Sequence, residues 1–203
     1  MTQLEKESLR RLGAGESIAA VCQGLHIDRA EFDRRWRATV ESRVPPTSGK
    51  VTAGVDPPVT IQRDPWGIPH IYASSDRDLY FGFGYAMAQD RLFQLDYLRR
   101  KGLGRLSEIL GKSGLEMDTV ARTVGLNRIA AAEWKRLPGE VRGVLEAFAA
   151  GVNLLIEQSG ENFPIEFDLL DYRPEPWTPI DSLAIENEFR WYLTGRFPII
   201  VMP

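Results

Sequence analysis

Short apolar stripes separated by glycines mark the first 44 residues and predict three short helices. The predicted ranges are Leu4–Leu12, Glu16–Leu25 and Asp28–Val44. Asp28 is followed three residues later by Glu31, a capping-box pattern in which both side chains satisfy backbone N–H groups at a helix start. The apolar positions of the three segments are expected to share one small core, formed by Leu9, Leu12, Ile18, Val21, Leu25, Ile27, Phe32 and Trp36.

A Pro-rich segment and a predicted hairpin follow these helices. Residues 45–58 are rich in Pro, Thr, Ser, Gly and Val, which is typical of a linker. Val59–Arg63 and Ile68–Ala73 are β-rich runs around the turn Asp64–Gly67 and predict a hairpin, which needs a larger sheet to be stable. The chain is therefore expected to consist of a small three-helix appendage (1–44), a linker (45–58) and a main region (59–203).

Helical periodicity dominates the rest of the chain and predicts a mostly helical α+β protein. The predicted helices are Asp76–Lys101, Arg105–Leu110, Met117–Val124, Leu126–Arg136, Gly139–Gln158 and Asp181–Leu193. Phe163–Trp177 contains three prolines and is expected to be irregular. Asp181 is placed to cap the last helix and Gly195 to end it.

The helix predicted at Asp76–Lys101 carries a carboxylate, Asp90, in its apolar stripe. The other stripe residues are Leu79, Phe83, Ala86, Phe93 and Tyr97. A carboxylate in this position would be largely buried, which is costly unless it is paired. Arg91 faces another side of the helix, so the partner of Asp90 is expected from another segment. A structural ion pair is favoured over a catalytic role for Asp90.

Charge and composition narrow the classes of partner. The 203 residues include 25 Lys and Arg against 28 Asp and Glu, and a net charge of −3 gives no overall attraction to nucleic acid or anionic lipid. The third predicted helix interleaves acidic residues with its arginines Arg29, Arg34, Arg35 and Arg37. A solvated helix face is therefore favoured over nucleic-acid binding. No apolar run reaches the roughly 18 residues of a membrane span, and the polar start lacks an export-signal pattern, so a cytoplasmic location is predicted.

Few residues offer catalytic or metal chemistry. The single cysteine and the two histidines lie in separate segments, which does not favour a zinc site. A hydrolytic triad can be assembled on paper from His70, Ser74 or Ser75, and Asp76 or Asp78. A serine that caps the helix beginning at Asp76 explains the same residues more simply. The residues alone indicate no convincing nucleophile, and no catalytic residue is assigned.

Six motifs follow one another along the main region: Val59–Ala73, Asp78–Asp96, Arg99–Gly111, Ala147–Asn153, Phe163–Phe167 and Pro174–Ser182. The first strongly resembles the opening hairpin of the penicillin acylase family, the N-terminal-nucleophile amidohydrolases that include cephalosporin and acyl-homoserine-lactone acylases. The second and third resemble the long helix of that family and its continuation. The resemblance covers about residues 59–197, and the order of several separate motifs makes it specific.

The resemblance implies that the chain is the α subunit of a heterodimeric, autoprocessed linear amide C–N hydrolase. The implied fold is a four-layer αββα N-terminal-nucleophile hydrolase, to which this mostly helical chain contributes beside its helical appendage. In the family the nucleophile is the first residue of a β subunit from the same precursor, and its α-amino group serves as base. The implied substrate is a small N-acyl compound with an apolar or aromatic acyl group. A higher oligomer through the N-terminal helices is left open.

By resemblance, the segment Trp191–Phe197, which follows the helix that starts at Asp181, lines the acyl pocket. The residue-by-residue matches are Leu193, Arg196 and Phe197. Leu193 and Phe197 are suited to an apolar acyl group, and Arg196 is suited to orient a carboxylate or gate the pocket. For Trp191 and Leu193, a place in the helix core is an equally open interpretation.

Two further questions stay open at this point. No cofactor is required for the implied chemistry, and a structural calcium ion is undecided, because Glu186 and Glu188 are the only acids near the segment and neither matches the family's ligand cleanly. The alternative function is a non-catalytic interaction or DNA-binding protein that retains an acylase-like remnant.

Overall fold

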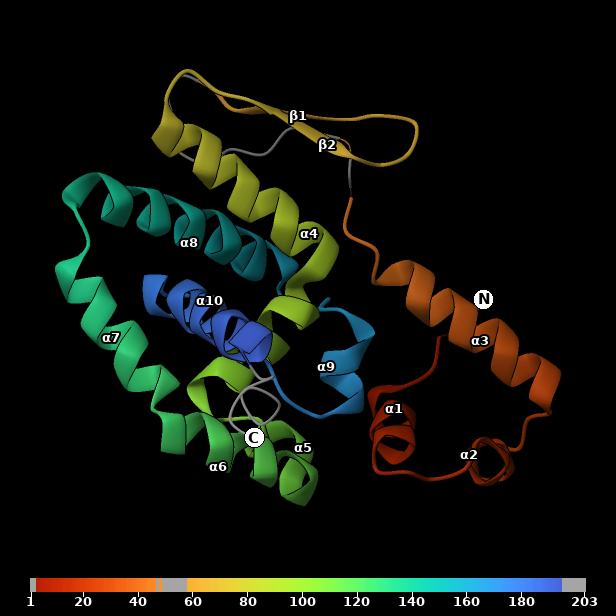
Figure 1. Cartoon of the computed structure of the whole chain (residues 1–203). Coiled ribbons are helices and arrows are strands. Elements are labelled where there is room, and N and C mark those ends of the chain that lie inside the picture. Colours follow the sequence, from red (N-terminus) through yellow and green to blue (C-terminus); the bar gives the residue numbers. More distant parts are fainter. Residues whose placement is uncertain (1–2, 47, 49–57, 195–203) are drawn as a thin grey trace. The chain divides into compact units, whose positions relative to one another are not determined.

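The computed structural model describes residues 3–46, 48 and 58–194, which fall into two units (Figure 1). We call the described residues up to Ser48 together with Ile156–Glu175 the helical unit, and residues 58–155 and 176–194 the main unit. The helical unit contains α1 (Lys6–Gly13), α2 (Ile18–Leu25), α3 (Arg29–Ser42) and α9 (Ile165–Leu169). The main unit contains β1 (Thr60–Arg63), β2 (Pro69–Tyr72), α4 (Asp76–Leu103), α5 (Ser107–Leu110), the 3-10 helix η1 (Gly111–Gly114), α6 (Leu115–Val124), α7 (Leu126–Arg136) and α10 (Pro179–Thr194). Helix α8 (Gly139–Ser159) belongs to the main unit as far as Leu155.

The core of the helical unit contains every apolar residue predicted for it. Leu9, Val21 and Phe32 are fully buried, and the other predicted positions pack against them. The core is completed by Ile165 and Leu169 of α9, a helix that lies within the segment expected to be irregular. That expectation is therefore wrong for residues 165–169, because one helical turn fits between Pro164 and the later prolines. The division of the chain at residues 44 and 58 stays a prediction.

The start of α3 realises half of the predicted capping box. Asp28 accepts a hydrogen bond from the backbone N–H of Glu31 at 2.7 Å and so caps the helix. The carboxylate of Glu31 does not return to the helix start, because it pairs with Arg34 and Arg35.

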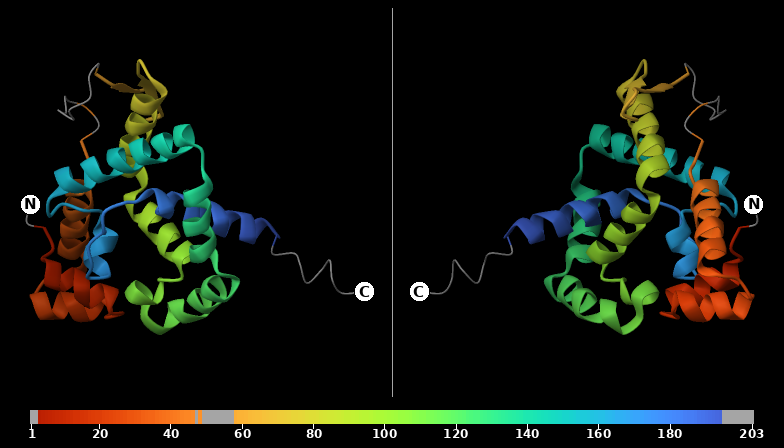
Figure 2. Two further views of the ribbon diagram at one scale, coloured as in Figure 1. Left: turned by 90° about the vertical axis from the view of Figure 1, so that its left-hand side faces the viewer. Right: turned by 90° about the vertical axis from the view of Figure 1, so that its right-hand side faces the viewer.

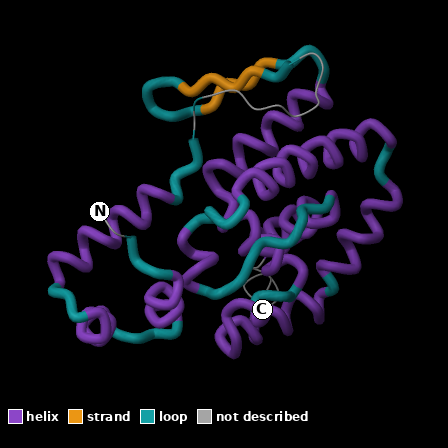
Figure 3. Tube along the Cα trace, turned by 180° about the vertical axis from the view of Figure 1, so that it is seen from behind, coloured by secondary structure: helices purple, strands orange, loops and turns teal. Residues whose placement is uncertain are grey.

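The predicted hairpin is confirmed: β1 pairs with β2 in antiparallel orientation, and Ile61 lies opposite Ile71. These are the only strands in the part of the chain that the structure describes (Figure 3). The hairpin lies on α4 at Gly82, where an added Cβ would come within 2.9 Å of the Ile71 side chain. A larger residue at Gly82 would therefore push the hairpin away from α4.

Helix α4 is longer than predicted and bends at Arg91, whose φ of −142° and ψ of 22° are not helical (Figure 2). The bend changes which residues face the interior. Asp90 is 37% exposed, so its predicted burial is wrong, whereas its predicted pairing with another segment is confirmed by Arg63 of β1 at 2.9 Å. The buried carboxylate of α4 is Asp96, at 1% exposure.

Small residues bring the neighbours of α4 unusually close. A Cβ on Gly84 would lie 2.1 Å from the carbonyl oxygen of Phe148 in α8, and one on Gly102 would lie 2.3 Å from that of Ala184 in α10. Helix α10 packs on α4 and α7 (Figure 1). Ala184 of α10 and Ala130 of α7 are fully buried. The close approach at Gly102 holds the first half of α10 against α4. The second half of α10 carries the candidate site.

Candidate functional site

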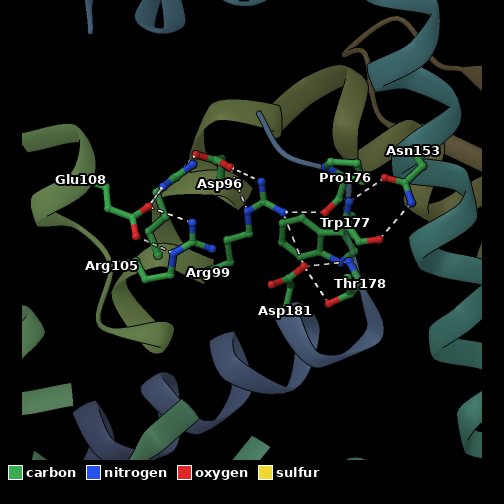
Figure 4. A network of polar contacts seen from close by, with 10 residues as sticks. Asp96, Arg99, Arg105, Glu108, Asn153, Pro176, Trp177, Thr178 and Asp181 are labelled. Carbon is green, nitrogen blue, oxygen red and sulfur yellow. Dashed lines mark hydrogen bonds and ion pairs between the residues drawn. The ribbon is translucent and has the colours of Figure 1, made fainter. Parts of the chain in front are cut away.

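A buried cluster of charges at the end of α4 fixes the base of the site (Figure 4). Asp96 accepts hydrogen bonds from Nε of Arg99 at 2.8 Å and Nε of Arg100 at 2.9 Å. All three side chains are at most 5% exposed. Arg100 also donates to Glu108 at 2.6 Å. Two guanidinium groups that share a buried carboxylate hold one another's orientation, so the cluster is rigid.

Arg99 connects this cluster to the start of α10. Its Nη1 donates to the carbonyl oxygen of Pro176 at 3.2 Å and lies 3.4 Å from Asp181, and its guanidinium lies 5.2 Å from the Trp177 ring centre. The backbone of Trp177 exchanges two hydrogen bonds with the side chain of Asn153 in α8, at 2.6 and 2.9 Å. Figure 4 shows these groups converging on the turn before α10.

The predicted N-cap role of Asp181 is wrong. Helix α10 begins at Pro179, so Asp181 lies in its first turn. Its carboxylate accepts the backbone N–H of Thr178 at 2.7 Å and the Thr178 hydroxyl at 2.9 Å. The Asp181 carboxylate thus stabilises the conformation of Thr178, the residue before α10, and it also lies 3.4 Å from Nη1 of Arg99.

The far half of α10 presents apolar side chains to the surface. Leu193 is 61% exposed, and the large neighbours exposed with it are Phe189, Trp191 and Tyr192. Leu193 therefore does not lie in the helix core. Arg196 and Phe197, the other predicted pocket residues, lie outside the described residues. The structure thus places one of the three predicted residues, at the exposed end of a firmly anchored helix.

Charged side chains flank this apolar end. Lys101 of α4 lies 2.6 Å from Glu188 and 5.8 Å from the ring centre of Tyr192. Across the helix, Glu133 of α7 accepts hydrogen bonds from Asn187 at 2.8 Å and Arg190 at 2.9 Å.

The acidic residues near the site already have cationic partners. Hydrogen bonding to Glu133, together with the charge of Glu186, raises the pKa of Arg190. Glu186 pairs with Arg190, and Glu188 pairs with Lys101. Among the described residues, no three His, Cys, Asp or Glu side chains gather closely enough to hold a metal ion. These acids do not fit a calcium site.

The hairpin does not form the triad considered from the sequence. His70 lies 3.3 Å from Asp64, and Ser75 caps α4 by accepting the backbone N–H of Asp78 at 3.2 Å. Asp64 also accepts the N–H groups of Trp66 and Ile68, each at 2.9 Å. Burial alone would raise the pKa of Asp64, but hydrogen bonds from Ile68, His70 and Trp66 lower it overall. Both groups therefore have structural roles: Asp64 orders the hairpin turn, and Ser75 caps the start of α4.

The arginines of α3 are largely neutralised by acids of the same helix. Arg29 pairs with Asp33 at 2.8 Å, and Glu31 takes both Arg34 and Arg35. Hydrogen bonds from Arg35 and Arg34 lower the pKa of Glu31, so that it stays charged. These contacts favour the solvated helix face over phosphate binding. None of the described helices has the length and hydrophobicity to cross a bilayer.

Sequence reasoning missed the cluster around Asp96. The signal was present, because Arg99 and Arg100 follow Asp96 at the three- and four-residue spacings that bring helical side chains together. The apolar stripe through Asp90 indicated the wrong carboxylate, because Gly82 and Gly84, which the stripe does not include, form part of the buried face of this half of α4.

Comparison with known proteins identifies a family that this chain matches. Residues 58–199 match the family model described as Penicillin amidase. The chain is 43% identical over 150 residues to the penicillin acylase 2 proenzyme of Pseudomonas sp. (strain SE83), covering 73% of this chain and 19% of that protein. It is 35% identical over 178 residues to the acyl-homoserine lactone acylase QuiP of Pseudomonas aeruginosa, covering 87% and 20%.

A solved structure supports the same relationship. The thermostable penicillin G acylase from Alcaligenes faecalis superposes with a TM-score of 0.63 at 32% identity, over 68% of this chain and 75% of that one. The chain spans about a fifth of the length of the curated relatives it matches.

Proposed function

The chain belongs to the penicillin amidase family, and we propose that it is the α-subunit region of an autoprocessed, two-chain amide hydrolase. The name of one relative, a proenzyme, supports formation from a longer precursor. The named activities of the relatives, penicillin acylase and acyl-homoserine lactone acylase, support cleavage of an N-acyl bond. The proposed substrate class is a small N-acyl compound with an apolar or aromatic acyl group.

The structural observation that carries the proposal is that the main unit exposes large apolar side chains on its hairpin and at the end of α10. Trp66 of the hairpin is 84% exposed, and Leu193 and Tyr192 of α10 are more than half exposed. A two-stranded hairpin is marginal by itself and gains stability from further strands. A β subunit from the same precursor would extend this hairpin into the four-layer αββα fold and cover the end of α10.

The proposed chemistry divides between the two chains. The hydroxyl or thiol of the first β-chain residue attacks the amide carbonyl, and its own α-amino group, with an ordinary pKa near 8, takes the proton and passes it to the leaving amine. The C–N bond breaks, an acyl-enzyme remains, and water releases the acid. This chain supplies one wall of the acyl pocket: Leu193 and Phe197 contact the apolar acyl group, and Arg196 orients a carboxylate or gates the entrance.

This scheme needs no cofactor for the chemistry. A structural calcium ion is given no ligands in this proposal, because Glu186 and Glu188 are engaged by Arg190 and Lys101. The proposal includes a cytoplasmic location and a higher oligomer through the N-terminal helices.

Processing and turnover of the full-length precursor test the proposal. Intact-mass measurement of the purified product should find a second polypeptide that begins with Ser, Cys or Thr, and the product should hydrolyse phenylacetyl or hexanoyl p-nitroanilide. A single unprocessed polypeptide without amidase activity would refute it.

A pair of leucines tests the pocket wall. Leu193→Ala should lower kcat/KM for phenylacetyl p-nitroanilide about 10-fold or more, because lost apolar contact in a pocket carries that discrimination. It should leave acetyl p-nitroanilide unaffected. Leu115→Ala is the control, since Leu115 of α6 is exposed to a similar degree. Equal effects of the two substitutions would exclude Leu193 from the pocket.

A further inference from the structure

One side chain of α4, that of Lys101, contacts the second half of α10. The first half of α10 is held by backbone packing at Ala184, but the second half points apolar residues outward. Lys101 of α4 contacts this half at two residues. Its Nζ lies 2.6 Å from a carboxylate oxygen of Glu188 and 5.8 Å from the ring centre of Tyr192.

The two contacts of Lys101 lie one helical turn apart. Glu188 and Tyr192 are four residues apart and therefore share a face of α10, so one ammonium group bridges consecutive turns. A cation above an aromatic ring is attracted by its electron-rich face. Leu193 follows Tyr192 directly in the chain, so a change in the direction of this turn moves the proposed pocket wall.

The pair is better shielded from solvent than the other ion pairs of this helix end. The side chains of Lys101 and Glu188 are 29% and 12% exposed, whereas those of Arg190 and Glu186 are 55% and 50% exposed. Screening by water and salt weakens an exposed pair much more than a partly buried one. The Lys101 contact is therefore suited to hold α10 in a fixed direction.

We propose that Lys101 is a positioning residue for acyl selectivity: it holds the end of α10 through Glu188 and Tyr192 and thereby sets the depth of the acyl pocket at Leu193. This inference rests on the proposed function. Lys101 does not contact the reacting atoms, and its effect is expected on the choice between acyl groups rather than on the chemical step.

Selectivity in the processed enzyme tests the inference. Lys101→Met keeps the length of the side chain and removes its charge, and Lys101→Arg restores a cation. The measurement is kcat and KM for acetyl, hexanoyl, decanoyl and phenylacetyl p-nitroanilides. Lys101→Met is expected to change the ratio of kcat/KM between the best and the next-best acyl group by about 10-fold, mainly through KM, since one methylene of pocket depth has this weight. Lys101→Arg is expected to return most of the original ratio.

Controls separate the possible outcomes. Lys135→Met, at an exposed lysine of α7, should leave the ratio unchanged. Glu188→Gln removes the same ion pair from the other side and serves if Lys101→Met fails to fold; it should shift the ratio in the same way. If the wild-type enzyme hydrolyses the amides and either variant keeps the wild-type ratio of kcat/KM between acyl groups, the positioning role alone would be overturned. Absence of amide hydrolysis in the wild-type enzyme would instead overturn the proposed function and this inference with it.

Discussion

Two aspartates of α4 provide a direct test of the charge cluster. Asp96 is 1% exposed and is shared by Arg99 and Arg100, whereas Asp90 is 37% exposed and pairs with Arg63. Replacing either by Asn keeps the size of the side chain and removes its charge. Asp96→Asn removes the buried carboxylate that both guanidinium groups share. Arg99 then keeps its 3.4 Å contact with Asp181, and Arg100 keeps its contact with the partly exposed Glu108. Loss of this shared buried charge should cost up to about 3–5 kcal/mol of folding free energy. Asp90→Asn should cost at most about 1 kcal/mol.

The assay is equilibrium unfolding of the processed enzyme in urea, followed by tryptophan fluorescence. Trp177 reports on the cluster, because its ring centre lies 5.2 Å from the Arg99 guanidinium. The midpoint of Asp96→Asn should fall well below that of Asp90→Asn, while the dependence on urea stays the same. Equal midpoints for both variants would refute the view that Asp96 anchors α4 to α10.

Four further outcomes follow from the packing and the charges. Gly102→Ala should destabilise by about 1–3 kcal/mol in urea unfolding, because its Cβ meets the backbone of α10, whereas Gly143→Ala in α8, with open space around it, should not; equal stabilities would contradict this. Burial raises the pKa of Asp118, but hydrogen bonds from Ser107 and Leu106 lower it overall. Its contribution to stability is therefore present above an unfolded pKa of about 4 and is lost as pH falls through the lower folded value, so the stability gap between wild type and Asp118→Asn should narrow in urea titrations below about pH 4. Deleting residues 1–44 should lower the thermal midpoint by uncovering Ile165 and Leu169, and an unchanged midpoint would argue against this. The 203-residue chain expressed alone should show no cooperative melting in calorimetry, and a sharp monomeric transition would count against the need for a β subunit.

Most of the secondary structure could be predicted because it depends on local periodicity. The hairpin, α7 and the start of α8 lie where the pattern of apolar and turn residues placed them. Helix α9 could not be recognised, because five residues between prolines are too few to show a period. The buried face of α4 was misjudged for another reason: Gly84 and Gly102 face its neighbours, and a hydrophobic stripe does not register glycines.

The candidate site was less accessible to such reasoning. Leu193 was identified by resemblance to a family, since an exposed leucine has no local signature of pocket lining. The partnership of Lys101 with Glu188 joins two helices distant in sequence, and only the packing of α10 on α4 brings them together. The bend at Arg91 likewise has no Pro or Gly beside it to announce it.

The role of α9 in the helical unit has a consequence for how the protein is made. Ile165 and Leu169 close the core of α1–α3, yet more than half of the polypeptide separates α9 from the end of α3. During translation the first three helices leave the ribosome with an apolar face that waits for a segment not yet synthesised. Completion of the amino-terminal structure is thus a late event in biosynthesis, and nascent chains stalled before α9 should be the ones that engage chaperones through this face.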